Sequence, residues 1–304
     1  MAHDPDAASP FPGEARDAIL AWYDASGRVL PFRGVSDPYA VLVSEAMAQQ
    51  TQVARAATYW QAWREQFPTV EALAAAPLAD VLRAWAGLGY NRRAVHLHRA
   101  AKAIVADHGG RVPDTVEALM ALPGIGPYTA RAVAAIAFGR PVGAVDVNVR
   151  RVLARVVAGD ADALAPSALQ ALADRAVSHA RPADWTHAVM DVGATFCRPT
   201  RPDCEACPAR AWCRYAAAER QTAVVSGPRS RTAAAPAFRA SSRWLRGRIL
   251  DRLRDAAPPG WDRFDGAIGE HGDEVVLGAL AALAREGLAE LDPADRRVAR
   301  LPEG

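Results

Sequence analysis

The stretch 122–130 reads Leu-Pro-Gly-Ile-Gly-Pro-Tyr-Thr-Ala and joins two helical patterns, over 116–122 and 129–138. Its glycines permit a sharp turn and the close approach of another group. Backbone amides at the N-terminus of the second helix are suited to holding a phosphate. The stretch therefore predicts two helices joined by a hairpin, with Gly124 and Gly126 as candidate contacts to a nucleic-acid backbone. An isolated glycine-rich turn would more often be an ordinary helix connection.

Helical periodicity extends outward from this hairpin in both directions. Apolar residues recur three and four positions apart, and strand-like alternation is almost absent between residues 14 and 220. Proline and glycine separate the patterns. The sequence predicts an all-α domain over 14–220 with further helices over 14–24, 40–66, 70–85, 94–107 and 147–157.

The composition changes after residue 220. Residues 221–241 are rich in Ala, Ser, Arg and Pro without helical period, which is typical of a linker. A small domain is predicted over 242–304, with helices over 243–255 and 274–286, a short helix between them, and a strand-like end at 297–301. This order is typical of a winged-helix-like domain.

An acid stands twenty residues after Gly126, in the string Val145-Asp146-Val147-Asn148-Val149. Aspartate is a favoured N-cap, so Asp146 could serve only the helix that follows it.

All four cysteines fall in one short stretch: Cys197, Cys204, Cys207 and Cys213, separated by six, two and five residues. In a cytosolic chain such a cluster favours a metal site over disulfides. Four thiolates suit either a tetrahedral zinc ion or a [4Fe–4S] cluster, and spacing alone does not choose between them.

The hairpin, the string around Asp146 and the cysteine spacing together resemble the helix-hairpin-helix DNA glycosylases of the endonuclease III and MutY superfamily. The resemblance covers about residues 14–220 and implies a fold of two helical lobes with a [4Fe–4S] loop at 197–213. It also implies that Asp146 stabilises the cationic sugar as the glycosidic bond breaks. Asn148 would hold that carboxylate or a nearby phosphate.

Tyr128 places the chain in one branch of this superfamily. Bifunctional members carry a lysine in the second helix of the hairpin, whereas Gly-Pro-Tyr-Thr-Ala is similar to the MutY type. The resemblance implies a monofunctional enzyme without lyase activity. The composition agrees, because Lys102 is the only lysine among 36 basic residues and a Schiff base normally needs a lysine amine.

A second MutY-like string, Val-Ser-Glu-Ala-Met-Ala-Gln-Gln-Thr-Gln-Val over 43–53, is expected on an early helix. Adenine leaves after a ring nitrogen is protonated, so a carboxylic acid of raised pKa is required beside the flipped base. By resemblance Glu45 is that acid; without the Gln-Gln-Thr run it would be interpreted as a surface glutamate.

The remaining candidates concern DNA binding. By resemblance Gln50 and Thr51 touch the base opposite the lesion, and Tyr90 acts as an aromatic wedge. A run of basic residues follows Tyr90: Arg92, Arg93, His96, Arg99 and Lys102. This run could contact phosphates or form a plain solvated face.

Three residues depart from the MutY pattern: Ala48 replaces leucine, Val147 replaces glycine, and Asn91 replaces a second tyrosine. The tail is also too short for the larger C-terminal domain that recognises 8-oxoguanine in MutY enzymes. Three hypotheses follow: removal of adenine opposite 8-oxoguanine or guanine, removal of thymine, uracil or another damaged base by the same fold, and DNA binding without catalysis. The intact set of Glu45, Tyr128 and Asp146 argues against the last.

The expected partner is double-stranded DNA with a mismatched or damaged base. The net charge of +2 leaves room for a local basic face without requiring one. No apolar run approaches the length of a membrane span, and the first residues are acidic rather than basic. We expect a monomer in the cytoplasm, associated with the nucleoid.

Overall fold

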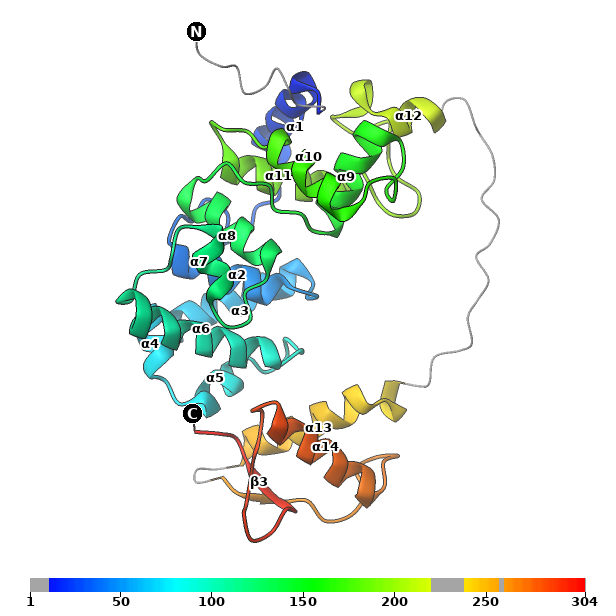
Figure 1. Cartoon of the computed structure of the whole chain (residues 1–304). Helices are drawn as coiled ribbons and strands as arrows, with labels where there is room; N and C mark the ends of the chain where they lie inside the picture. Colours follow the sequence, from blue (N-terminus) through cyan, green and yellow to red (C-terminus); the bar gives the residue numbers. More distant parts are fainter. Residues whose placement is uncertain (1–10, 220–237, 257–259, 304) are drawn as a thin grey trace. The chain divides into compact units, whose positions relative to one another are not determined.

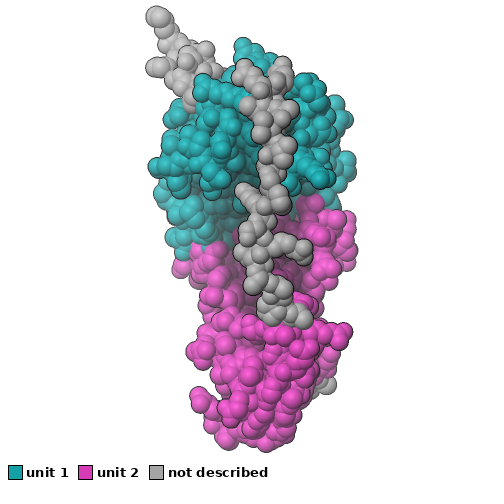
Figure 2. All heavy atoms as spheres, turned by 90° about the vertical axis from the view of Figure 1, so that its right-hand side faces the viewer, with its two compact units in different colours: residues 1–45, 113–121, 125–227 teal, residues 46–112, 122–124, 228–304 magenta. Residues whose placement is uncertain are grey.

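The computed structural model describes residues 11–219, 238–256 and 260–303. The described residues divide into two compact units, one formed by those within 1–45, 113–121 and 125–227 and the other by those within 46–112, 122–124 and 228–304 (Figure 2). Within the described residues, no helix combines the length and apolar character needed to cross a membrane.

The first unit is helical (Figure 1). It contains α1 Gly13–Ser26, most of α2 Pro38–Ala48, α7 Val116–Ala121, α8 Pro127–Phe138, α9 Val147–Ala158, α10 Pro166–Ala176, α11 Pro182–Thr195, the short 3-10 helix η1 Arg210–Trp212 and α12 Arg214–Glu219. The buried faces of α1, α9, α10 and α11 meet in one apolar core around Ile19, Leu153, Leu172 and Val189. That core holds the start of α9, and with it Asp146.

The second unit begins with a helical lobe of α3 Val53–Gln66, α4 Val70–Ala75, α5 Leu78–Ala84 and α6 Arg92–His108. Trp63 and Trp85 meet edge to face with ring centroids 5.4 Å apart, and Phe67 packs on Trp63 at 4.9 Å. Trp60, Trp63 and Trp85 are core residues, since each is at most 8% exposed. The all-α prediction for the body of the chain is confirmed.

Two predicted helices are interrupted. The pattern over 40–66 is split between α2 and α3, because Gln50 adopts a left-handed backbone with φ 53° and ends the helical hydrogen bonding. The prediction that the Gln-Gln-Thr run lies on a helix is therefore wrong, and Gln50 and Thr51 lie in a turn. The pattern over 70–85 is broken at Pro77 into α4 and α5, as a proline within a helix dictates.

The C-terminal part contains η2 Phe238–Ala240, α13 Ser242–Asp255, β1 Asp262–Arg263, α14 Asp273–Arg285, β2 Glu290–Leu291 and β3 Val298–Arg300. The strands form an antiparallel sheet in the order β1-β3-β2, with Asp262 opposite Ala299 and Leu291 also opposite Ala299. The short helix expected between the two long ones is absent from the described residues there, and β1 takes its place. Most of the predicted linker 221–241 lies outside the described residues, but its end forms η2.

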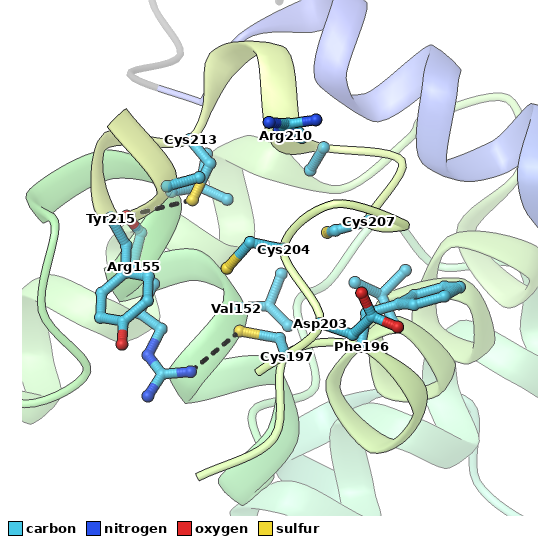
Figure 3. Close-up of a pocket in the computed structure, with 14 residues that line it drawn as sticks. Val152, Arg155, Phe196, Cys197, Asp203, Cys204, Cys207, Arg210, Cys213 and Tyr215 are labelled. Carbon is cyan, nitrogen blue, oxygen red and sulfur yellow. Dashed lines mark hydrogen bonds between the residues drawn. The ribbon is translucent and has the colours of Figure 1, made fainter. Parts of the chain in front are cut away.

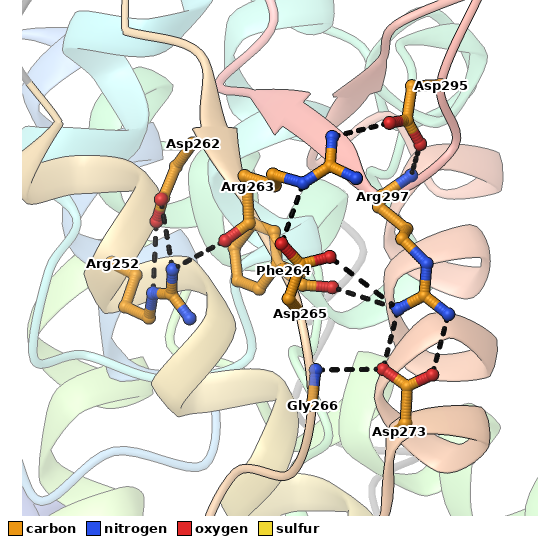
Figure 4. A network of polar contacts seen from close by, with 9 residues as sticks. All are labelled: Arg252, Asp262, Arg263, Phe264, Asp265, Gly266, Asp273, Asp295 and Arg297. Carbon is orange, nitrogen blue, oxygen red and sulfur yellow. Dashed lines mark hydrogen bonds and ion pairs between the residues drawn. The ribbon is translucent and has the colours of Figure 1, made fainter.

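Charged pairs join the elements of this C-terminal part (Figure 4). Arg252 of α13 binds Asp262 of β1 at 3.0 and 2.9 Å, and Arg297 binds Asp273 at the start of α14 at 2.7 Å through both nitrogens. The hydrogen bonds from Arg297 lower the pKa of Asp273 to about 2. Because these pairs lie in water, they fix the relative positions of strands and helices more than they add stability.

Candidate active site

The hairpin connects α7 to α8 by a turn that needs its first glycine. Gly124 has φ 77°, and a Cβ at this position would lie 2.4 Å from Cβ of His96. Gly126 is the N-cap of α8 and Pro127 is the first residue of that helix, which therefore begins two residues before the predicted start at 129. The turn places Tyr128 in the first turn of α8.

Three predicted catalytic side chains interact electrostatically in the first unit: Glu45 of α2, Tyr128 of α8 and Asp146 at the start of α9. Burial raises the pKa of the Glu45 carboxyl. A hydrogen bond with Tyr128 and the charge of Arg33 oppose this shift, while the charge of Asp146 adds to it. A carboxyl in this environment keeps its proton to higher pH than one in water, which is the property a general acid needs.

Tyr128 stays neutral between these acids. Burial raises the pKa of its phenol well above the usual value, and the charges of Glu45 and Asp146 add to that effect. The phenol also donates to Sδ of Met190 at 3.8 Å. Tyr128 therefore supplies a neutral hydrogen-bonding group, and no amine, at this position.

Asp146 caps the N-terminus of α9, and hydrogen bonds fix the orientation of its carboxylate. Its Oδ1 accepts from the backbone amides of Asn148 at 2.9 Å and Val149 at 2.7 Å, while its Oδ2 accepts from Nδ2 of Asn148 at 3.0 Å. The structural role considered in the sequence is thus present, and the same hydrogen bonds orient the carboxylate. Asn148 packs so tightly on α11 that a Cβ at Gly193 would lie 2.5 Å from its own Cβ.

Arg33 and Asp191 belong to this region and escaped the sequence analysis. Asp191 is fully buried on α11 and accepts from Arg33 at 2.9 Å, and from the backbone amide and Nε of Arg28 at 3.1 and 2.8 Å. Arg33 also donates to the hydroxyl of Tyr23 at 3.1 Å. Arg33 is positioned by these hydrogen bonds and carries the positive charge that acts on Glu45 and Tyr128.

The start of α9 is connected to the cysteine loop by hydrogen bonds. Buried Arg151 donates to Oδ1 of Asn148 and to the carbonyl of Gly193, both at 2.7 Å, and its Nε donates to the carbonyl of Cys197. One turn later Arg155 donates to Sγ of Cys197 at 3.5 Å and to the carbonyl of Arg198 at 2.9 Å. Through Arg151, hydrogen bonds therefore connect the cysteine loop to Asn148, the residue that holds Asp146.

The four cysteines line one pocket whose walls are otherwise largely apolar (Figure 3). Val152, Val156, Val192 and Phe196 form much of its lining, and Arg155 stands at its edge. Burial raises the pKa of the Cys207 thiol to about 11 and also raises that of Cys213. In the described part of the chain, no three Cys, His, Asp or Glu side chains are arranged to hold a metal ion.

In the second unit, Arg93 ties together two predicted DNA-reading loops. Its guanidinium donates to the carbonyl oxygens of Ala46 (2.8 Å), Met47 (3.1 Å), Gln49 (2.5 Å), Leu88 (3.1 Å) and Gly89 (3.0 Å), and to Oγ1 of Thr51 (3.1 Å). Burial lowers the pKa of Arg93 to about 10, so it remains charged at neutral pH. Both interpretations of the basic run, a solvated face or a phosphate-binding one, are wrong for this residue.

The other predicted DNA-binding residues of this unit are accessible. Gln50 is exposed, and Tyr90 is 44% exposed in a left-handed conformation with φ 47°. Arg92 is also exposed, with Nε 4.0 Å from Glu286. The predicted site residues are divided between the two units. One unit holds Glu45, Gly126, Tyr128, Asp146 and Asn148, and the other holds Gln50, Thr51, Tyr90, Arg92 and Gly124.

Known proteins resemble this chain in sequence and in fold. Residues 43–176 match the HhH-GPD superfamily of base excision DNA repair proteins. The chain is 47% identical over 246 residues to the adenine DNA glycosylase of Mycobacterium tuberculosis strain H37Rv, covering 79% of each protein. It is 46% identical over 211 residues to that of Homo sapiens, covering 66% of this chain and 39% of the human protein.

Two solved structures resemble the helical body. A thermostable thymine-DNA glycosylase matches with a TM-score of 0.63 and 30% identity, covering 67% of this chain and 95% of that one. Endonuclease III in a non-covalent complex with DNA has the same fold, with a TM-score of 0.58 and coverage of 68% and 95%. The chain therefore belongs to the MutY-type adenine DNA glycosylases of the helix-hairpin-helix superfamily, enzymes of base excision repair that hydrolyse an N-glycosidic bond.

Proposed function

We propose that this glycosylase removes adenine mispaired with 8-oxoguanine or guanine, flips the adenine out of the duplex and leaves an intact abasic site. The observation that carries the proposal is the environment of Glu45, whose pKa is raised by burial beside a neutral Tyr128 and a held Asp146. Purine loss is accelerated by protonation of the ring, and a carboxylic acid of raised pKa, which keeps its proton to higher pH than one in water, can supply that proton.

In the proposed reaction, Glu45 donates its proton to a ring nitrogen of the flipped adenine. The glycosidic bond then breaks, the base departs with the bonding electron pair, and positive charge develops on the sugar. The Asp146 carboxylate, fixed by Asn148 and the amides of α9, stabilises that charge. Water adds to the sugar carbon and loses a proton, which completes the hydrolysis.

We expect no Schiff base with the opened sugar. Tyr128 stands in the first turn of α8 where a lysine would be needed, and Lys102 is the only lysine of the sequence. Borohydride added during the reaction should therefore trap no protein–DNA adduct, while a bifunctional glycosylase assayed in parallel on its own substrate should be trapped. A covalent adduct with this enzyme would contradict the monofunctional assignment.

We propose that Cys197, Cys204, Cys207 and Cys213 hold a [4Fe–4S] cluster. Four cysteines around one pocket supply the thiolate ligands that such a group takes, although no three of them surround a common point in the described structure, and the zinc alternative would need the same four ligands. Bound there, the group would be structural: it would order residues 197–213, whose carbonyl at Cys197 accepts from Arg151.

Replacing Cys204 with serine should release the iron and reduce soluble yield, because one of four ligands is lost. The measurement is the iron content of the purified protein together with its visible absorbance. Serine at the exposed Ala206 of the same loop is the matched control and should retain iron. Zinc without iron in the unaltered protein would eliminate the cluster proposal.

For DNA binding, we propose that the two glycines of the hairpin hold a phosphate, that Gln50 and Thr51 contact the base opposite the adenine, and that Tyr90 enters the stack. Arg92 would leave its ion pair with Glu286 to bind a phosphate, as its exposed position allows. The proposed form is a cytoplasmic, nucleoid-associated monomer. Its C-terminal part, in this proposal a winged-helix-like domain over 242–304, follows a linker at 221–241.

The deciding experiment is single-turnover excision on duplexes with adenine opposite 8-oxoguanine, guanine or cytosine, and with thymine or uracil opposite guanine. We expect adenine opposite 8-oxoguanine to be cut fastest. Faster removal of a pyrimidine would favour the alternative suggested by the similarity to a thymine-DNA glycosylase, and would assign the departures at Ala48 and Val147 to a changed base pocket.

A further inference from the structure

The C-terminal part is anchored on the helical lobe of its own unit, next to the turn that carries Tyr90. Arg254 of α13 donates to the carbonyl of Leu82 at 3.0 Å and to Oδ1 of Asn91 at 2.7 Å, and its side chain is only 9% exposed. The backbone amide of Leu78 also donates to the carbonyl of Glu303 at 3.0 Å. The end of α13 and the last described residue therefore both contact α5, and Arg254 also contacts the turn after it.

These contacts give a physical account of Asn91. A neutral amide oxygen at this position accepts the hydrogen bond of Arg254, whereas a tyrosine side chain would have to occupy the same space. Asn91 directly follows Tyr90 in sequence, so the anchor of the C-terminal part acts on the neighbour of the proposed wedge.

A second arginine of α13 reaches Tyr90 itself. The guanidinium carbon of Arg243 lies 4.8 Å from the centre of the Tyr90 ring, and that of Arg93 lies 5.7 Å from the same centre. A cation at this distance from an aromatic ring is attracted to it. Because Tyr90 has a strained left-handed backbone and is 44% exposed, such contacts restrain a side chain that would otherwise be poorly held.

The charge of Arg243 is available to a ligand, unlike the charges of its neighbours. The other arginines of α13 each pair with a carboxylate: Arg246 with Glu286 at 2.7 Å, Arg248 with Asp251, Arg252 with Asp262 at 2.9 Å, and Arg254 with Asp251 at 3.1 Å. Exposed Arg243 has no such partner among the residues that the structure describes. An unpaired cation beside the proposed wedge matches the charge of a DNA phosphate.

We propose that Arg243 is a DNA-binding residue, which the C-terminal part adds to the proposed DNA-contacting residues Gln50, Thr51 and Tyr90. It binds a backbone phosphate and positions the Tyr90 ring. The inference rests on the proposed role of Tyr90. It assigns to the C-terminal part a direct contact with the duplex beside the site where the base pair is opened.

The test compares Arg243→Ala with Arg248→Ala, an exposed arginine of the same helix whose charge is paired. Binding to a duplex with 8-oxoguanine opposite a non-cleavable adenine analogue is measured between low and moderate salt. For Arg243→Ala we expect about tenfold weaker binding at low salt. The salt slope, which is the slope of the logarithm of the binding constant against the logarithm of the salt concentration, should be shallower by about one. The control should show little change in either quantity. Equal changes in the two variants, or no change in Arg243→Ala, would overturn the proposal.

Two further variants separate phosphate binding from positioning. Arg243→Lys should restore the salt slope because it keeps the charge, but should restore the excision rate only in part because it cannot stack as a planar group on Tyr90. Arg243→Ala combined with Tyr90→Ala should lose less excision rate than the product of the two single losses. Strictly multiplicative losses would reject the positioning role.

The same experiments distinguish failure of this inference from failure of the proposed function. If the unaltered enzyme does not excise adenine opposite 8-oxoguanine, the proposed substrate is wrong, and the salt slope still decides whether Arg243 binds a phosphate. If the unaltered enzyme excises and Arg243→Ala binds and cuts like it, the inference alone is wrong. Melting temperatures should match, because exposed Arg243 contributes nothing to a buried core.

Discussion

Replacing Asp146 with asparagine is expected to slow single-turnover excision of adenine by about a thousandfold, because a fixed charge that stabilises the developing cation is removed. Binding to the mismatched duplex should persist. The substitution isolates charge from structure: asparagine caps helices about as well as aspartate, and its remaining side-chain oxygen can still accept from the amides of Asn148 and Val149.

The matched control is Asp162→Asn, which removes an exposed carboxylate paired with Arg150 beyond the end of α9. This variant should excise like the unaltered enzyme, since surface pairs contribute little to stability. Asp146→Ala should additionally lower the free energy of unfolding by about 1 kcal/mol through loss of the cap. Residual activity of Asp146→Asn within about tenfold of normal would remove the carboxylate from the mechanism, because that loss is far below the effect of a preorganised charge.

The parts of this site that the sequence predicts are those set by local backbone geometry. Asp146 precedes an apolar helical pattern, so its capping role and its place at the start of α9 follow from a few neighbouring residues. Gly126 and Pro127 are local signals for the start of α8, but the prediction relied on the apolar pattern and began the helix at 129 instead of 127. Assigning chemistry to these positions required the family resemblance, because capping alone is a sufficient explanation of an aspartate there.

The residues that the sequence analysis missed act over long separations. Asp191 and Arg33 are 158 positions apart and meet only in the folded chain. One signal was available: Asp191 is a single acid within the buried, mostly apolar part of α11, where an unpaired charge would be costly. Such a residue implies a cationic partner, but the sequence does not say which of the many arginines it is.

Arg93 shows a different limit. Adjacent basic residues in a sequence suggest one shared face, yet α6 directs Arg92 to solvent and Arg93 toward the carbonyls of two loops. The end of α2 and the turn before α6 leave carbonyl groups without helical partners, and a guanidinium with several donors satisfies them together. That requirement arises from two turns distant in sequence, so periodicity cannot reveal it.

The C-terminal part was predicted correctly where its elements are long. Helices of 14 and 13 residues show clear periodicity, whereas β1 and β2 have two residues each, too few for an alternating pattern. Its anchoring through Arg254 and Asn91 explains a residue that the sequence could only record as a departure from the family pattern.

Replacing Glu45 with glutamine is expected to slow adenine excision by about a hundred- to ten-thousandfold, because the amide keeps the size of the side chain and cannot give up a proton. The unaltered enzyme should lose activity as the pH rises through the pKa of Glu45, which burial has raised. The residual rate of the variant should lack that decline. The measurement is single-turnover excision across pH with both proteins, alongside Glu117→Gln as an exposed control on α7.

Although Glu45→Gln is expected to reduce excision, it should raise the stability of the folded protein at high pH. Because the folded state raises the pKa of Glu45, native protein holds this proton more tightly than unfolded protein does, and stability falls as the pH rises from the unfolded pKa through the folded one. Glutamine carries no charge to desolvate. Glu45→Gln should therefore melt at a higher temperature than the unaltered enzyme above that pH window, and at a similar temperature below it.

Loss of excision together with a gain of stability at high pH would identify Glu45 as a residue that serves catalysis at a cost in stability. A variant that is inactive and also less stable at every pH would indicate that Glu45 is a structural residue whose hydrogen bond with Tyr128 supports the fold. A variant that excises adenine normally would contradict proton donation by Glu45 even if the melting temperature rises as expected. Only loss of excision with gained stability at high pH fits a buried general acid beside Tyr128 and Asp146.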